Sequence, residues 1–149
     1  MKLKIPPALQ FLLFALIMYG ITRLSGNHFV FEFQNIIVWV FIILGLSIGL
    51  TAVFSFRKAK TSVDPLHPSK ASQLVTSGLY RYTRNPMYLA MLFGLIAIFF
   101  KFGNYYNIAI VMLFIWYITT YQIKPEEKVL IEIFGDDFTN YCKKTRRWI

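Results

Sequence analysis

The residues with the chemistry to act on a ligand gather in two short stretches of the sequence. Residues 73–88 read Gln-Leu-Val-Thr-Ser-Gly-Leu-Tyr-Arg-Tyr-Thr-Arg-Asn-Pro-Met-Tyr, and residues 126–127 are paired glutamates. Arg84 and Asn85 place hydrogen-bond donors directly before Pro86, which suits the first turn of a helix. Because the N–H groups at a helix N-terminus attract negative charge, this stretch suits an anionic group such as a carboxylate.

The same residues also fit a simpler role, as the turn by which the chain enters a membrane. Arginine is common at the level of the lipid head groups, and tyrosine in the aromatic belt beside them. From the residues alone, a ligand site and a membrane-entry turn both stay open. A metal or thiol enzyme is not indicated, since His28 and His67 lack partners at metal-ligand spacing and Cys142 is the single cysteine.

Four apolar stretches are predicted to position these polar residues. Three are charge-free and close to the roughly 20 residues that span a bilayer. The fourth has 14 apolar residues and spans only if Lys101 extends to the head groups, so a re-entrant helix remains an alternative. The expected spans are roughly residues 5–22, 36–56, 87–102 and 105–122, with a tight hairpin at residues 101–104.

Composition agrees with a membrane protein. Hydrophobic residues make up 56% of the 149, above the roughly 45–50% of a soluble domain. We therefore expect a single all-α domain: an integral membrane helical bundle of about four transmembrane helices plus a cytoplasmic C-terminal amphipathic helix. The interiors of the predicted spans carry no charge, which argues against a channel or pump.

The basic residues that give the net charge of +9 are concentrated in two segments, and their positions predict the orientation in the membrane. Of the 16 lysines and arginines, six lie in residues 57–86 and six from Lys124 onward. Basic loops stay on the cytoplasmic side, so both termini are expected there, with membrane lipid and not nucleic acid as the partner of these charges. Residues 1–4 and the apolar run behind them are interpreted as a retained first helix, not a signal peptide.

The C-terminal tail, residues 125–149, is predicted to be a helix lying along the head groups. Pro125 and the two glutamates suit a helix start, and Gly135 suits a helix end. Its basic residues, which are Lys143, Lys144, Arg146 and Arg147, fit simple attraction to anionic lipids. In the second span, Gly45 and Gly49 permit close helix packing, and packing within a monomer is favoured over a dimer.

Three motifs in this order resemble a known family. Leu74-Val-Thr-Ser-Gly-Leu-Tyr80, Arg84-Asn-Pro-Met-Tyr88, and Glu126-Glu127 with the later Phe-Gly and tyrosine are similar to the isoprenylcysteine carboxyl methyltransferase and phospholipid methyltransferase superfamily. The resemblance runs from about residue 63 to the C-terminus, and the first two helices match only in hydropathy. It implies methyl transfer from S-adenosylmethionine to a lipophilic or prenylated acceptor at the cytoplasmic membrane face.

The resemblance also implies roles for individual residues. Residues 63–86 would form a cofactor loop, with catalytic roles for Arg84 and Glu127 and an acceptor site at Gln122 and Arg84. The cofactor-binding residues would be Gln73, Leu74, Val75, Tyr80, Asn85, Pro86, Met87, Tyr88 and Glu126.

Two positions depart from the family pattern. Asn85 stands where many relatives carry histidine, so a general base is not expected there. Gln122 stands where the eukaryotic carboxyl methyltransferases carry arginine, so carboxyl methylation of a prenylcysteine is not indicated by this position. Two other classes stay open: a sterol-reductase-like NADPH enzyme, and a small non-enzymatic helical membrane protein with a lipid-binding basic tail.

Overall fold

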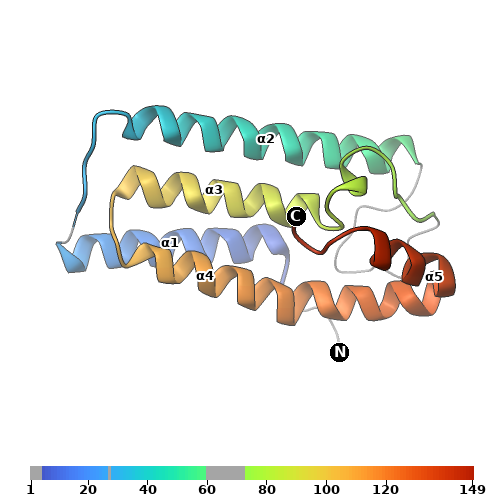
Figure 1. The fold of residues 1–149 in the computed structure, drawn as a ribbon. Coiled ribbons are helices and arrows are strands. Elements are labelled where there is room, and N and C mark those ends of the chain that lie inside the picture. Colours follow the sequence, from blue (N-terminus) through green and yellow to red (C-terminus); the bar gives the residue numbers. More distant parts are fainter. Residues whose placement is uncertain (1–4, 27, 60–72) are drawn as a thin grey trace.

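The computed structural model describes residues 5–26, 28–59 and 73–149, and these residues form a helical bundle (Figure 1). The part of the predicted cofactor loop at residues 63–72 lies outside the described residues, as do residues 1–4. The elements are α1 (Pro7–Ser25), α2 (Gln34–Lys58), the 3₁₀ turn η2 (Gly78–Arg81), α3 (Pro86–Phe102), α4 (Asn107–Ile118), the π-helical turn η3 (Thr119–Ile123) and α5 (Lys124–Lys144). The predicted all-α membrane bundle is confirmed.

The first four α-helices lie at the predicted spans, to within four residues at each end. α1 and α2 are long and apolar enough to cross a membrane, as is the continuous helix Asn107–Lys144, while α3 has 17 residues. The 38 residues of Asn107–Lys144 would measure about 57 Å as a helix, nearly twice the roughly 30 Å of the hydrocarbon core. Only its apolar part, up to Ile123, therefore has the composition and length to lie in hydrocarbon, and α5 extends beyond that part.

α1 and α3 run in the same direction, with α2 packed closely along α3. Near the start of α1, Phe11 lies against Gly94, and further along Tyr19 lies against Phe102 with ring centroids 6.0 Å apart. On α2, a Cβ added at Gly45 would lie 3.1 Å from the Ala90 carbonyl oxygen. The glycine pair in the second span thus serves packing within the chain.

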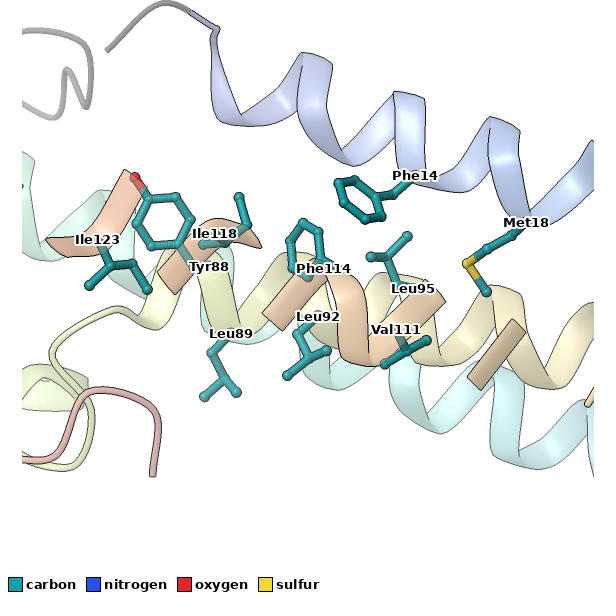
Figure 2. Close-up of a cluster of buried hydrophobic side chains, with 10 residues drawn as sticks. All are labelled: Phe14, Met18, Tyr88, Leu89, Leu92, Leu95, Val111, Phe114, Ile118 and Ile123. Atoms are coloured by element: carbon teal, nitrogen blue, oxygen red, sulfur yellow. The ribbon is translucent and has the colours of Figure 1, made fainter. Parts of the chain in front are cut away.

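The core lies between α1, α3 and the helix that begins with α4 (Figure 2). Phe14 and Phe114 meet edge to face at its centre, with ring centroids 5.3 Å apart. The buried side chains of this inner cluster are Phe14, Met18, Tyr88, Leu89, Leu92, Leu95, Val111, Phe114, Ile118 and Ile123. Because it reaches from α1 to η3, the cluster fixes the start of α3 relative to the end of α4.

A tight hairpin joins α3 to α4 at the end of the bundle away from Pro86. Gly103 ends α3 with φ 59°, a left-handed conformation that glycine adopts without strain. A Cβ there would lie 2.2 Å from the Phe29 carbonyl oxygen, and the Phe29 N–H donates to the Gly103 carbonyl at 2.5 Å. Glycine is therefore required for both backbone conformation and close approach.

Gly135 interrupts α5 as expected, but the helix does not end there. Its φ of 52° and ψ of −122° produce a kink, after which a further helical segment runs to Lys144. That segment turns back toward the bundle, and the chain then returns to the start of α3 (Figure 1). The last residues, 145–149, are thus not helical, although a helical tail was expected to reach position 149.

Candidate functional site

Four segments meet at the end of the bundle where α3 begins: the loop around η2, the first turn of α3, the first turn of α5, and the C-terminal segment 145–149. The Tyr141 hydroxyl donates to the Tyr80 carbonyl at 2.6 Å, which ties α5 to the loop. The Arg84 N–H donates to the Arg146 carbonyl at 3.0 Å, which ties the loop to the C-terminal segment. Residues that are 61 and 62 positions apart in sequence are thereby brought together.

The loop takes this course for local reasons. Gly78 begins η2 with φ 63°, which favours glycine, and Asn85, with φ −129° and ψ 54°, lies outside the helical region, as is common before a proline. No side chain caps the start of α3, because the Asn85 amide donates instead to the Arg147 carbonyl at 2.9 Å. The N-terminus of α3 therefore keeps its attraction for an anionic group.

A chain of hydrogen bonds runs from the start of α3 into the bundle. The Tyr88 hydroxyl and the Gln122 amide, the latter at 2.9 Å, both donate to Oε1 of Glu126. Gln122 Oε1 in turn accepts a hydrogen bond from Nε2 of Gln10 on α1, at 3.2 Å. We call these four residues the polar chain; it connects α1, α3, η3 and α5.

The environment of the polar chain shifts the pKa of Glu126, its member on α5. Burial raises the pKa of the Glu126 carboxyl from 4.5 to about 7, while the hydrogen bonds from Tyr88 and Gln122 oppose that increase. The carboxyl therefore changes charge near neutral pH. Shifts of this size are enriched at functional sites, although structural networks also produce them.

Glu127, the next residue, lies in a separate ion-pair cluster. Its Oε1 is 2.8 Å from Nη2 of Arg84, and its Oε2 is 2.7 Å from Nη2 of Arg147. Arg147 also donates from Nε to Oε1 at 3.0 Å, and this bonding to Glu127 raises the Arg147 pKa. Nη1 of Arg84 donates to the Cys142 carbonyl at 3.2 Å. Glu127 thus holds Arg84 in a fixed orientation.

Most of the predicted site residues meet at this end of the bundle. Gln122, Glu126 and Glu127 lie beside Arg84, Asn85 and Tyr88, as the bonds above show. The apolar candidates lie under the loop, in a second cluster that joins α2, α3 and α5: Leu74, Val75, Tyr80 and Met87 pack there around Ala52, Phe138 and Tyr141. Pro86 is buried at the first turn of α3, and Gln73 is exposed.

Two residues of this site were not predicted from the sequence. The sequence predicts Arg147 on a lipid-binding basic surface, but its side chain, which is 35% exposed, is paired with Glu127. No sequence signal marks it, because its position depends on the return of the chain after α5. Gln10 carried a weak signal, as a polar residue in an otherwise apolar run, and it was overlooked.

The family model for phospholipid methyltransferases matches residues 33–137, well over half of the chain. The chain belongs to the phospholipid methyltransferase family. The resemblance inferred from the three motifs is confirmed, and the matched region contains α2, the loop, α3, α4 and most of α5. Gln10 and Arg147 lie outside that region.

Curated relatives point to the same superfamily. A protein-S-isoprenylcysteine O-methyltransferase from Schizosaccharomyces pombe is 26% identical over 117 residues, which are 78% of this chain and 50% of that protein. An Oryza sativa protein named as a probable protein-S-isoprenylcysteine O-methyltransferase is 27% identical over 112 residues, 75% of this chain and 59% of the relative. An uncharacterised Haemophilus influenzae protein is 40% identical over 63 residues, its whole length. The chain thus spans about half the length of the named relatives.

As a member of this family, the chain presents two kinds of chemistry at one end of a membrane bundle. The start of α3 and the second apolar cluster offer an anion site beside an apolar surface. The polar chain offers a carboxyl group and neutral amides that extend from α5 to α1. A molecule with both charged and apolar parts would be complementary to this arrangement.

Proposed function

We propose that the protein is an S-adenosylmethionine-dependent methyltransferase that acts on a lipophilic acceptor at the cytoplasmic membrane face. The observation that carries the proposal is the contact of Tyr88 and Glu126, which joins the two motif regions at the boundary between apolar bundle and polar end. Membership of a methyltransferase family favours this function over an NADPH enzyme or a non-enzymatic membrane protein.

The residues present fit the chemistry of the cofactor. The uncapped N-terminus of α3, at Asn85, Pro86 and Met87, would bind the methionine carboxylate. Glu126 would accept hydrogen bonds from the ribose hydroxyls or the ammonium group. The adenine would lie against Leu74, Val75 and Tyr80, with Gln73 at the rim and Tyr88 on the far side. When bound, the cofactor supplies a methyl group that is already activated for transfer.

The other charged residues would act by positioning. Glu127 and Arg147 hold the Arg84 guanidinium, and Arg84 Nε is buried without a partner among the described residues. That N–H is a spare donor, and we assign it to an anionic group of the cofactor or the acceptor. Because methyl transfer needs alignment of the reacting atoms and exclusion of water more than acid–base catalysis, a rigid Arg84 would contribute to the rate.

The acceptor is proposed to enter from the membrane between helices, with its head group near Gln122, Arg84 and Tyr88. The names of the relatives favour a prenylcysteine-like carboxylate, and the family name favours a lipid head group. Both are compatible with a monomer whose termini face the cytoplasm.

Calorimetry on the purified protein in detergent tests the cofactor assignment. Glu126→Ala should weaken binding of S-adenosylmethionine and of its demethylated product by about 10-fold or more, because a charge-assisted hydrogen bond is lost. Glu132→Ala is the matched control, since this glutamate is exposed on the same helix. Unchanged affinity in Glu126→Ala would remove the assignment. No binding by the wild-type protein would favour a non-enzymatic role, and binding of NADPH instead would favour a reductase.

A further inference from the structure

An apolar groove runs along the half of the bundle that lies away from the candidate site. α1 and α2 both pack on α3 (Figure 1), and the groove between them has a volume of about 410 Å³. Its apolar lining includes Phe11 of α1, Trp39 and Ile42 of α2, and Gly94 and Ala97 of α3. Trp39 is 63% exposed, so the groove is open toward lipid. A volume of this size is typical of a ligand site, and in a membrane an apolar chain would fill it.

Two polar residues, Asn35 and Lys101, line one end of this groove. Asn35 is the second residue of α2 and Lys101 the next-to-last residue of α3, so both lie near the hairpin of Gly103. Both are exposed, and within the described part of the chain no hydrogen bond or ion pair holds either side chain. The groove is therefore apolar along its length and carries an ammonium group and an amide at its outer end.

Lys101 is not needed to complete the end of its own helix. Lysines in a last turn often bind the final carbonyl groups, but here these have other partners. The Phe100 carbonyl accepts a hydrogen bond from Nε2 of Gln34 at 2.5 Å, and the Phe102 carbonyl lies 3.3 Å from Nδ1 of His28. The Lys101 ammonium group is thus free to bind an external anion.

The membrane setting makes an unpaired lysine here unusual. The Gly103 end is predicted to face away from the cytoplasm, and basic residues are disfavoured on that side. Arg23 lies at the same end, but its Nε donates to the Tyr19 hydroxyl at 3.0 Å and its guanidinium is 5.2 Å from the centroid of that ring. Lys101 has no such partner among the described residues. An anionic head group beside it would supply one.

The dimensions of the groove match one leaflet of the bilayer. Gly94 and Lys101 are seven residues apart on α3, about 10 Å along the helix, and one leaflet contributes about 15 Å of hydrocarbon. A chain whose head group is at Lys101 would therefore stay within that leaflet. Pro86 is 15 residues from Lys101, about 22 Å, so a head group bound there cannot reach the candidate site. The ligand of the groove is thus distinct from a methyl acceptor.

We infer that the groove binds an anionic phospholipid from the leaflet at the Gly103 end. The lipid phosphate pairs with the Lys101 ammonium group and accepts a hydrogen bond from the Asn35 amide, and one acyl chain lies in the groove between α1 and α2. A zwitterionic lipid has the same phosphate, but its own cation competes with Lys101 for it. Net charge of the head group therefore decides the preference. The inference is independent of the proposed function.

The fluorescence of Trp39, which lines the groove, tests the inference. The chain has three tryptophans, so Trp116→Phe with Trp148→Phe leaves Trp39 as the single reporter. The protein is placed in phosphatidylcholine nanodiscs that contain increasing amounts of phosphatidylglycerol or phosphatidylcholine with the same brominated acyl chains, which quench tryptophan on contact. Half-maximal quenching should need an about 5-fold lower mole fraction of the phosphatidylglycerol, because one lysine beside an anionic lipid favours it by about that factor. Equal mole fractions would overturn the inference.

Variants of Lys101 assign the preference to this residue. Lys101→Gln should make the two brominated lipids equally effective, whereas Lys101→Arg keeps the charge and should retain the preference. Arg23→Gln is the matched control, because it removes a cation from the same end that is already bound to Tyr19, and it should also retain the preference. A preference that survives Lys101→Gln would contradict the assignment.

Two further measurements separate binding in the groove from general enrichment of anionic lipid around the protein. Ala97→Leu places a larger side chain in the groove and should weaken quenching of Trp39 by the brominated phosphatidylglycerol although Lys101 is intact. With Trp116 as the single tryptophan, the two lipids should quench equally, since Trp116 is 55% exposed on α4 and does not line the groove. Unchanged quenching in Ala97→Leu, or the same preference at Trp116, would overturn the inference.

Discussion

Two adjacent glutamates at the start of α5 lie in different electrostatic settings. Consecutive residues on a helix point about 100° apart, so Glu126 faces the bundle and Glu127 faces the C-terminal segment. Glu126 accepts hydrogen bonds from the neutral groups of Tyr88 and Gln122, whereas Glu127 is paired with two guanidinium groups. The first arrangement leaves a carboxyl that titrates near neutral pH, and the second holds Arg84 in place.

The raised pKa of Glu126 predicts how stability depends on pH. Its pKa is about 7 in the folded protein against an ordinary 4.5, so the folded state holds this proton more tightly than the unfolded state. The stability it contributes is therefore complete below pH 4.5 and is lost as the pH rises through 7. Relative to Glu126→Gln, which cannot titrate, the wild-type apparent Tm should fall by about 5 °C between pH 5 and pH 8.

Thermal unfolding of both proteins in the same detergent across this pH range provides the measurement. Because other titrating groups are common to both, the difference between the two curves isolates Glu126. Parallel curves would show that the carboxyl does not have a raised pKa.

At the scale of elements, two irregular segments build the site. The π-helical turn η3 carries Gln122 between α4 and α5, and such turns are frequent at functional sites. After α5, the C-terminal segment packs back over the loop: the Asn85 side chain donates to the Arg147 carbonyl, and the Trp148 indole donates to Thr119 at 3.1 Å. This segment therefore connects α3, η3 and α5 at the site.

Removing the side chain of Arg147 should loosen that connection. Arg147→Met breaks two charge-assisted hydrogen bonds to Glu127 and should lower stability by about 2 kcal/mol, with weaker cofactor binding because Arg84 is then held less firmly. Arg146→Met is the matched control. The Arg146 side chain is exposed and its backbone makes the contact to Arg84, so the change should stay within about 0.5 kcal/mol. Chemical denaturation and calorimetry measure the two effects, and equal effects of the two variants would contradict the role of Arg147.

At the scale of the whole molecule, the site occupies one end of the bundle and the hairpin of Gly103 the other. α1 and α3 run away from the site, so the chain must return to it along α2 and along α4 (Figure 1). The described basic residues of the loop region, Arg57, Lys58, Arg81 and Arg84, lie at the site end together with those of the tail, which predicts that this end faces the cytoplasm. Tyr82 lies at the site end and Tyr105 at the opposite end, and both are exposed, at 74% and 62%.

Cysteine labelling tests this orientation. In a Cys142→Ser background, which removes the single cysteine, Tyr105→Cys should react with a membrane-impermeant maleimide on intact bacterial cells that express the protein. Tyr82→Cys should react only after the cells are permeabilised. The similar exposure of the two tyrosines makes them a matched pair, and the opposite labelling pattern would invert the predicted topology.

The sequence by itself determined the helices and the family. Hydropathy predicted the positions of α1 to α4, because a segment needs about 20 apolar residues to cross a bilayer whatever its neighbours are. The motifs around Tyr80, Asn85 and Glu126 predicted the family, since local turn and helix-start chemistry is encoded by adjacent residues. The same local rules predicted a helix end at Gly135, where α5 is kinked but continues to Lys144.

Only the tertiary structure decided which polar side chains pair with one another. That Gln10 reaches Gln122, and that Arg147 pairs with Glu127, depends on which helix faces meet and on the path of the chain after the kink in α5. These partners are 112 and 20 residues apart in sequence, and neither pairing has a periodicity that a local pattern could reveal. The different environments of Glu126 and Glu127 also depend on the tertiary structure, because burial and charge pairing are properties of the packed bundle.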